Sequence, residues 1–366
     1  MSLREFIQDV SLIDNHAHQI TPVENDLSPE TFAGYFTEGA GSHHARHTMN
    51  YRRGLSVVAE FLGDGSEADL VERRGDVEFD AYARELMNET DVSHILQDTG
   101  TPPGSDPKTF AQYTDADVRP ILRIENEIED LIEATDTFGA FEEAFTDRCT
   151  DALTGDHVGL KSIIAYRTGL NITTPARSEA AKAYYDVSEN WTGRIEHPVL
   201  LNYTAHLATV IAGEHDAPIQ FHSGFGDIDA HPQYVDPSYM WGFLKAHRDT
   251  DIVLLHASYP YTRTAGYIVS LLENVYLDLG MTIPFIQHGV EPMLRHALEL
   301  APASKLLYSS DGYGVPEWYV LAERLVRDNL ATVLEDLVAN GTIDEVYAEE
   351  VAAGILRENA ERLYPL

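Results

Sequence analysis

The chain has 366 residues, and its 60 acidic side chains outnumber its 25 basic ones to give a formal net charge of −35 at pH 7. So strong a negative field repels phosphate backbones and anionic headgroups, which excludes nucleic acids and membranes as expected partners. The acidic residues are spread along the chain instead of being gathered in a tail, which predicts a folded protein with a hydrated, halophile-like surface.

Cysteine content and the N-terminus narrow the class of protein further. A single cysteine, Cys149, excludes an internal disulfide framework and a thiolate-rich metal cluster. Residues 1–6 contain no signal-like cleavage site, and no stretch approaches the roughly 20 apolar residues of a membrane helix. We therefore expect a cytoplasmic protein that acts on a small molecule. A homo-oligomer is compatible with the sequence, which contains no interface motif.

The first predicted strand ends in a group of potential metal ligands. The apolar run Ser11–Ile13 leads into Asp14, Asn15, His16, Ala17 and His18. Alternate residues of a strand share a face, so Asp14, His16 and His18 should point the same way. Two neutral imidazoles on one face supply half of a site for zinc or iron.

Residues 19–90 are predicted to form an elaborated first βα connection with several helices, among them 48–62 and 79–88. We expect this helical insertion to belong to one domain that spans residues 1–366. Long loops near a site often carry binding groups, so Arg46 and His47 are candidate substrate contacts. Closely spaced histidines of this kind belong to a solvated loop more often than to a metal site.

Strands and helices alternate along the rest of the chain. Predicted strands cover 92–98, 118–125, 157–165, 218–222, 252–256, 275–280 and 305–311; predicted helices cover 138–152, 176–187, 199–215, 239–247, 265–272 and 290–300. Eight strands with helices between them predict a (β/α)8 TIM-like barrel with a helical insertion after strand 1. A doubly wound open sheet is the alternative, and the lack of a glycine-rich phosphate loop after the first strand argues against it.

Further ligand-type residues stand at the ends of the later strands. His222, His256 and Asp311 close strands five, six and eight, and Lys161 lies inside strand four. Singly, the histidines could be satisfied structural residues, Asp311 could cap a helix, and Lys161 could neutralise nearby carboxylates. Because the active site of such a barrel lies at the C-terminal ends of its strands, their recurrence there with the first histidine pair predicts a metal site.

This arrangement resembles the amidohydrolase superfamily, with His-x-His after strand one, a strand-four lysine, histidines after strands five and six, and an aspartate after strand eight. The stretches 159–170, 220–227 and 255–261, and the ending 359–366, are similar to the amidohydrolase-2 group. Within that group they look most like the fluG-type domains associated with glutamine synthetase.

The resemblance implies that His16, His18 and Asp311 hold a first divalent metal, which His222 joins unless it binds a second one. With two metals, a carboxylated Lys161 would bridge them, and His222 and His256 would bind the second. With one metal, His256 would instead contact the substrate. Zinc is the expected ion, and nitrogen and oxygen ligands also accept iron, manganese or nickel.

The expected chemistry is hydrolysis of an amide or other C–N bond in a small molecule. The metal would activate water, Asp311 would act as general base, and His256 or Arg167 would stabilise the developing charge. Arg167 and Tyr166 could hold a substrate carboxylate, although a structural salt bridge explains Arg167 equally well. The alternatives are a single-metal decarboxylase or lyase on the same barrel, and a non-catalytic binding protein, which retention of every ligand-type residue argues against.

Overall fold

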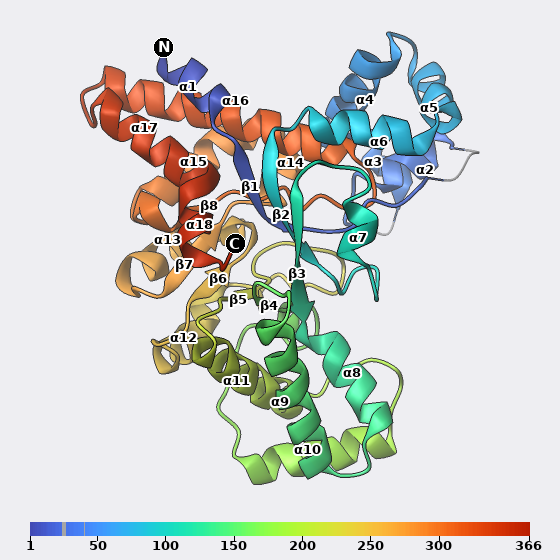
Figure 1. Cartoon of the computed structure of the whole chain (residues 1–366), viewed down its shortest axis with the longest axis vertical. Coiled ribbons are helices and arrows are strands. Elements are labelled where there is room, and N and C mark those ends of the chain that lie inside the picture. The colour runs from blue at the N-terminus through green and yellow to red at the C-terminus, as the bar shows by residue number, and fades with distance from the viewer. Residues whose placement is uncertain (24–26, 40) are drawn as a thin grey trace.

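The computed structural model describes residues 1–23, 27–39 and 41–366. Within these ranges eight strands form one sheet in sequence order, and each strand runs parallel to the next. The strands are β1 (Leu12–Ala17), β2 (Val92–Asp98), β3 (Asp117–Arg123), β4 (Leu160–Ser162), β5 (Ile219–Phe221), β6 (Ile252–Leu254), β7 (Val275–Asp278) and β8 (Leu306–Leu307). The prediction of a (β/α)8 TIM barrel is confirmed (Figure 1).

Backbone hydrogen bonds between β1 and the residues that follow β8 bring the ends of the sheet together. The amide of Asn15 donates to the carbonyl oxygen of Tyr308 (3.1 Å), and the amide of Asp311 donates to the carbonyl oxygen of His16 (3.0 Å). The segment that carries Asp311 is therefore tied directly to the segment that carries the first histidines.

Several strands are shorter than the sequence predicts. The predicted strands 252–256 and 305–311 contain only β6 and β8, so His256 and Asp311 lie beyond the strands that lead to them. Both residues have positive φ angles, 65° for His256 and 49° for Asp311. A left-handed residue cannot continue a β-strand, and this ends the extended backbone at the mouth of the barrel.

Five described helices fill the first βα connection, as predicted. They are α2 (Pro29–Gly34), α3 (Ser42–Ala45), α4 (Met49–Leu62), α5 (Glu67–Asp76) and α6 (Phe79–Asn88). Residues 24–26 and 40 of the predicted 19–90 connection lie outside the described residues. Figure 1 shows these helices beside β2, away from α8–α11.

The other helices precede, follow or connect the strands. They are α1 (Leu3–Asp9), α7 (Pro107–Phe110), α8 (Ile124–Ala134), α9 (Phe138–Thr154), η1 (Ile164–Tyr166), α10 (Arg177–Glu189), α11 (Pro198–Glu214), η2 (Pro237–Met240), α12 (Trp241–Ala246), η3 (His256–Ser258), α13 (Thr262–Leu271), α14 (Thr282–Ile286), η4 (Gln287–Gly289), α15 (Val290–Leu298), η5 (Ala303–Lys305), α16 (Glu317–Ala339), α17 (Glu345–Ala353), η6 (Gly354–Glu358) and α18 (Asn359–Leu363). In the described part of the chain, no helix combines the length and the apolar character that crossing a membrane requires.

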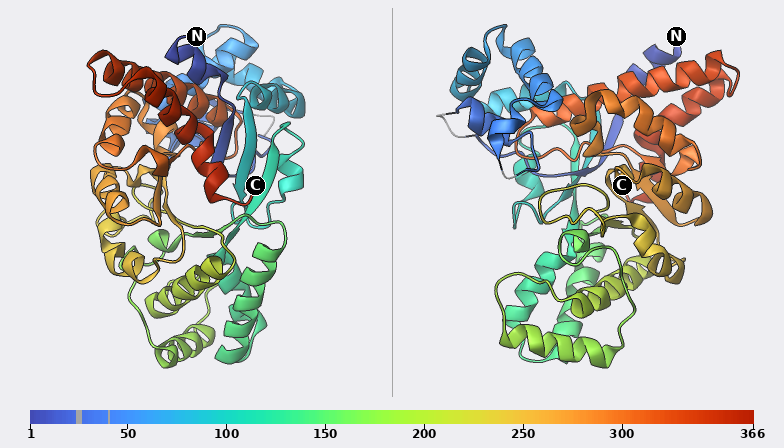
Figure 2. Two further views of the ribbon diagram at one scale, coloured as in Figure 1. Left: turned by 60° about the vertical axis from the view of Figure 1, so that its left-hand side comes forward. Right: turned by 180° about the vertical axis from the view of Figure 1, so that it is seen from behind.

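The helical insertion shares a hydrophobic core with the barrel. Val57, Leu70 and Leu86 from the insertion belong to one buried cluster with Ile95 of β2 and Leu321 of α16. The views in Figure 2 show α16 running alongside these helices. The continuous core is compatible with one domain over 1–366, which stays a prediction.

A separate cluster fills the barrel interior. It contains the buried residues Ile13, Leu96, Ile121, Val158, Val253, Leu255, Leu307, Ala360, Leu363 and Tyr364. The last three come from α18 and the residue that follows it, so the C-terminal segment contributes side chains to the inside of the barrel.

Candidate metal centre

A β-bulge in β1 aims the first histidines at the site. Asp14 pairs with Ile95 and Ala17 pairs with Gln97, so Asn15 and His16 together oppose one residue of β2. An extra residue of this kind bends a strand and redirects its side chains. It puts Asn15 and His16 both in contact with Gln220.

The bulge corrects the expectation that Asp14 shares a face with the two histidines. The Asp14 carboxylate accepts hydrogen bonds from the backbone amide and the hydroxyl of Ser310, and it pairs with no imidazole of the described residues. Burial raises the pKa of Asp14 to about 7, although the Ser310 hydrogen bonds oppose this shift. Asp14 thus fixes the backbone next to Asp311.

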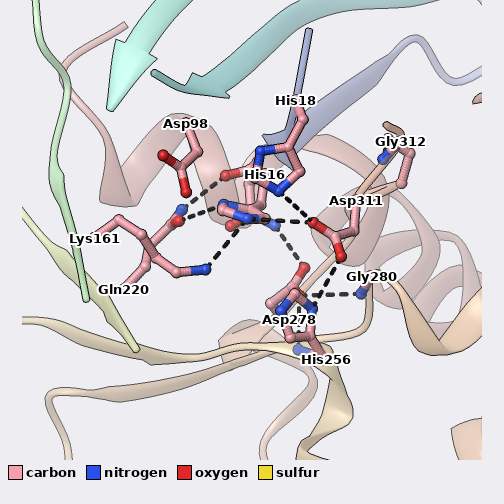
Figure 3. A network of polar contacts seen from close by, with 12 residues as sticks. His16, His18, Asp98, Lys161, Gln220, His256, Asp278, Gly280, Asp311 and Gly312 are labelled. Carbon is pink, nitrogen blue, oxygen red and sulfur yellow. Dashed lines mark hydrogen bonds and ion pairs between the residues drawn. The ribbon is translucent and has the colours of Figure 1, made fainter. Parts of the chain in front are cut away.

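Asp311 faces the imidazoles of His16, His18 and His256 (Figure 3). Its Oδ1 is 3.3 Å from Nε2 of His16 and 3.2 Å from Nε2 of His18, and its Oδ2 is 3.9 Å from Nδ1 of His256. The ring of His222 is 4.6 Å from that of His256, centre to centre. The structure therefore brings together the histidines and the aspartate that the strand ends predict.

Two hydrogen bonds hold His256 in its left-handed conformation. Its amide donates to Oδ1 of Asp278 (3.0 Å), and its carbonyl oxygen accepts from the hydroxyl of Thr282 (2.6 Å). Sparsely populated backbone conformations of this kind cost free energy and concentrate at functional sites. Asp278, which closes β7, was not singled out in the sequence.

The buried polar atoms of the cluster fit a divalent cation. Among the described residues, His222 Nε2, His256 Nδ1 and Asp311 Oδ1 are buried without a hydrogen-bond partner, which is rare for such atoms. Burial moves the pKa of His16, His222 and His256 well below the usual value, so these imidazoles are neutral and can act as ligands.

Two groups of three side chains in the described ranges have potential ligand atoms within 4.8 Å of one another. One is His16, His256 and Asp311, and the other is His16, His18 and Asp98. The second group includes a carboxylate that the sequence analysis missed. Asp98 closes β2, so the rule that identified the other strand-end residues could have found it.

Asp98 is held by Arg123, another missed residue, at the end of β3. The guanidinium Nη2 is 2.6 Å from Oδ2 of Asp98, and Nε is 3.1 Å from the same oxygen. Burial would raise the pKa of Asp98, but the charges around it, that of Arg123 foremost, and the Arg123 hydrogen bonds together outweigh burial and hold the pKa at about 2. Asp98 therefore remains a carboxylate beside His18 and Lys161.

Lys161 points into the barrel, as its position in β4 predicts. Its Nζ donates to Nε2 of His16 at 3.3 Å. Burial lowers the pKa of Lys161 to about 8, and the nearby Asp98 and Asp311 charges oppose this change. In mildly alkaline solution, Lys161 is therefore an uncharged amine in a substantial fraction of the molecules.

The cluster lines a cavity of about 660 Å³. Tyr166 and Arg167 also line it; the Tyr166 ring lies 4.1 Å from the His222 ring, and Arg167 pairs with Glu129 at 3.4 Å. The Nε of Arg167 is buried without a hydrogen-bond partner among the described residues. The ion pair with Glu129 agrees with a structural role for Arg167, and the Nε at the cavity, unpartnered in the described chain, agrees with a substrate contact.

Arg46 and His47 are not among the described residues that line this cavity. Arg46 pairs with Glu30 and Glu67 inside the insertion, which holds its guanidinium there. The geometry gives no support to substrate contacts by these two residues. Glu38 of the same insertion does line the cavity, and the sequence analysis missed it.

Comparison with known proteins places this site in a family. Residues 201–366 match the family described as Amidohydrolase. The whole chain aligns at 30% identity with Protein fluG of Emericella nidulans, over 414 aligned positions. The chain belongs to the amidohydrolase superfamily. It spans about half the length of this curated relative, 47%.

Solved structures share the same amidohydrolase fold. A Lactobacillus casei ATCC 334 protein that has been assigned as a metal-dependent hydrolase superposes with a TM-score of 0.91 at 27% identity, over 99% of this chain and 97% of that one. Glucuronate isomerase from Caulobacter crescentus superposes with a TM-score of 0.69 at 13% identity, over 99% and 92% of the two chains. The second likeness concerns the fold alone.

Proposed function

We propose that this chain is a metal-dependent hydrolase that cleaves an amide or other C–N bond in a small molecule. The observation that supports this most directly is the convergence of buried imidazoles, Lys161 and Asp311 on one cavity, with ring and carboxylate atoms that lack hydrogen-bond partners in the described chain. Membership of the amidohydrolase superfamily agrees with it.

His16, His18, His222, His256 and Asp311 would hold one or two divalent ions, with zinc as the expected metal. A divalent ion held there would supply a Lewis acid that activates water and polarises a carbonyl oxygen. The imidazoles of His16, His222 and His256, which burial keeps neutral, and the carboxylate of Asp311 supply ligand atoms that such an ion needs.

Asp311 would act as the general base. It stands where three imidazoles meet, and one of its carboxylate oxygens has no hydrogen-bond donor in the described chain, so that oxygen can accept a proton. Transfer of that proton to the leaving nitrogen completes the cycle. Arg167 or, when only one ion is bound, His256 would stabilise the oxyanion that develops during attack; both residues line the same cavity.

Lys161 favours the hydrolase over the single-metal lyase. A free lysine amine adds carbon dioxide and releases a proton to give a carbamate, and a lowered pKa makes that amine available near neutral pH. The carbamate would supply the bridging ligand of a two-metal site. Tyr166 and Arg167 would then bind a carboxylate of the substrate.

Metal content and turnover test the proposal together. The protein should retain divalent metal after gel filtration, hydrolyse at least one member of an amide, dipeptide and cyclic-amide panel, and lose turnover with chelator. Asp311→Asn should lower turnover by at least about 10³-fold with the far-UV spectrum unchanged, since it removes the base. Asp229→Asn, which lines the same cavity, is the matched control.

Full activity of Asp311→Asn would end the general-base assignment. A wild-type protein that takes up no metal from a zinc, iron or manganese solution would end the hydrolase proposal.

A further inference from the structure

Four buried polar side chains lie directly behind the imidazoles, and we call them the interior polar layer: Asn15 of β1, Gln220 of β5, Asp278 of β7 and Tyr364 after α18. Each is 3% exposed or less. None of them belongs to the candidate ligand set, and all four are hydrogen-bonded to one another in a chain.

Backbone carbonyls fix the orientation of both amides in this layer. Asn15 Nδ2 donates to the carbonyl oxygen of Tyr308 at 2.8 Å, so its Oδ1 must be an acceptor, and Tyr364 donates its hydroxyl hydrogen to it at 3.0 Å. Gln220 Nε2 donates to the carbonyl oxygen of Asn15 and to the Tyr364 hydroxyl oxygen, both at 2.8 Å. A carbonyl oxygen only accepts, which excludes the flipped amides.

These orientations determine the tautomer of His16. With the Gln220 amide nitrogen occupied, its Oε1 faces Nδ1 of His16 at 2.7 Å, so Nδ1 must carry the hydrogen. The lone pair then lies on Nε2, which faces Lys161 at 3.3 Å and Asp311 at 3.3 Å. This is the atom that a metal would need, and second partners of this kind fix the ring of a metal-binding histidine.

The second branch of the layer leads to His256. Asn15 Nδ2 also donates to Oδ2 of Asp278 at 2.8 Å, and Oδ1 of Asp278 accepts from the His256 amide at 3.0 Å. The Tyr364 hydroxyl is therefore the point where the His16 branch and the His256 branch meet.

We propose that Tyr364 is a positioning residue which, through Gln220, holds His16 in the Nδ1–H tautomer and so prepares Nε2 to bind metal. The inference rests on the proposed role of His16 as a ligand. The competing explanation is that Tyr364 serves only to fill the interior cluster, in which its ring is buried beside Leu363 and Ile13.

Tyr276 provides a matched control. It packs against the same interior cluster, and its hydroxyl makes no hydrogen bond to any described residue. Tyr364→Phe and Tyr276→Phe therefore remove the same atom from two tyrosines that pack in or against the same cluster, but only the first removes a member of the interior polar layer.

The tautomer can be read without metal or substrate. In metal-free protein with 15N-labelled histidine, the His16 ring should show a slowly exchanging Nδ1–H and an unprotonated Nε2; loss of the signals in His16→Asn assigns them. Tyr364→Phe should broaden or shift these signals and speed exchange of the Nδ1 hydrogen, whereas Tyr276→Phe should leave them unchanged.

Metal affinity, measured with zinc against a competing chelator, supplies the second readout. Gln220→Leu should weaken binding by about 10- to 100-fold and Tyr364→Phe by about 3- to 10-fold, as removal of a group behind a ligand does. The double variant should bind like Gln220→Leu alone, because Tyr364 acts through Gln220.

The proposal is overturned if Tyr364→Phe matches Tyr276→Phe in both readouts, or if its effect adds fully to that of Gln220→Leu. If Gln220→Leu does not fold, the comparison of the two tyrosine variants decides alone. A wild-type protein that binds no metal would end the proposed function, and the tautomer measurement would still decide whether the layer acts on His16.

Discussion

Glu38 is a cavity residue whose charge depends strongly on its surroundings. It forms no ion pair within the described residues, and burial together with the charges of Asp311 and Asp227 raises its pKa from 4.5 to about 7. A carboxyl with a raised folded-state pKa binds a proton more tightly when folded. Ionisation of Glu38 therefore lowers the free energy of unfolding progressively as the pH rises from 4.5 to 7.

We expect Glu38→Gln to become more stable than the wild type as pH rises. The difference in free energy of unfolding should be small near pH 4, should grow from pH 4.5 to 7 and should be constant above, because only the wild type then carries the unfavourable charge. Urea denaturation of the metal-free proteins measures it. Glu143→Gln, at an exposed position of α9, is the control; a flat difference across this range would contradict the assignment.

Lys161 gives a second prediction at the same scale. Its pKa of about 8 means that the free amine increases as pH rises through 8. With bicarbonate present, metal content should rise from near one equivalent per chain at pH 6.5 towards two at pH 8.5, because only the free amine forms the carbamate. Elemental analysis after gel filtration measures it.

Lys161→Met should stay near one equivalent at every pH. If the variant binds as much metal as the wild type at pH 8.5, the carbamate bridge is wrong.

Strand-end residues were the part of the site that the sequence could predict. His16, His18, His222, His256 and Asp311 stand at the ends of apolar runs, and parallel strands bring such ends together. Asp98 follows the same rule and was overlooked. Tyr364 could not have been found this way, because its contact with Gln220 depends on how α18 packs into the barrel.

At the scale of elements, the bulge in β1 shows what periodicity cannot reveal. Strict alternation places Asp14 with His16, but one extra residue between Asp14 and Ala17 separates them. No glycine or proline in β1 indicates this bulge, since the register depends on β2 as well. The predicted strand lengths were wrong as well: β6 and β8 already end at Leu254 and Leu307, before the left-handed residues His256 and Asp311 that close the predicted strands.

A buried ion pair connects the insertion to the barrel. Arg74 of α5 contacts Glu317 of α16, both side chains are 0% exposed, and Tyr82 of α6 donates its hydroxyl hydrogen to the same carboxylate. Because Arg74 also lies over the Tyr82 ring, at 4.5 Å, three helices meet at this one pair.

Arg74→Met should lower the free energy of unfolding by about 3–5 kcal/mol, since it leaves a buried carboxylate without its counter-charge. Arg74→Met/Glu317→Gln should recover most of that loss, because the uncompensated charge is gone and Tyr82 keeps an acceptor. Urea midpoints of the two variants measure the difference. A single variant that costs less than about 1 kcal/mol would show that the pair is not required.

At the scale of the whole molecule, the net charge of −35 is expected to lower the stability of the fold. Like charges spread over one surface repel one another and oppose compaction. Added salt shortens the range of that repulsion, from about 10 Å at 0.1 M to about 3 Å at 1 M.

The melting temperature should therefore rise steadily between about 0.1 and 1 M KCl. The rise should be similar in NaCl and CsCl, because screening depends on ionic strength and not on the identity of the ion. Differential scanning calorimetry of metal-free protein measures it. A melting temperature that falls with salt, or that responds to one cation alone, would contradict the predicted halophile-like surface.

The closure of the barrel also has a consequence during protein synthesis. Asn15 and Tyr308, which are hydrogen-bonded across the closure, are 293 residues apart. At roughly 5–20 residues per second, a ribosome needs roughly 15–60 s to make the intervening chain. Throughout that time one edge of β1 has no partner, and apolar Leu12 and Ile13 lie along it.

We expect a nascent chain arrested before residue 300 to be held by a chaperone through this edge, and one arrested well beyond residue 311 to be released. Crosslinking from position 12 in the two arrested chains would measure this. Equal crosslinking in both arrested chains would show that the edge of β1 is protected from the chaperone without pairing to the segment that follows β8.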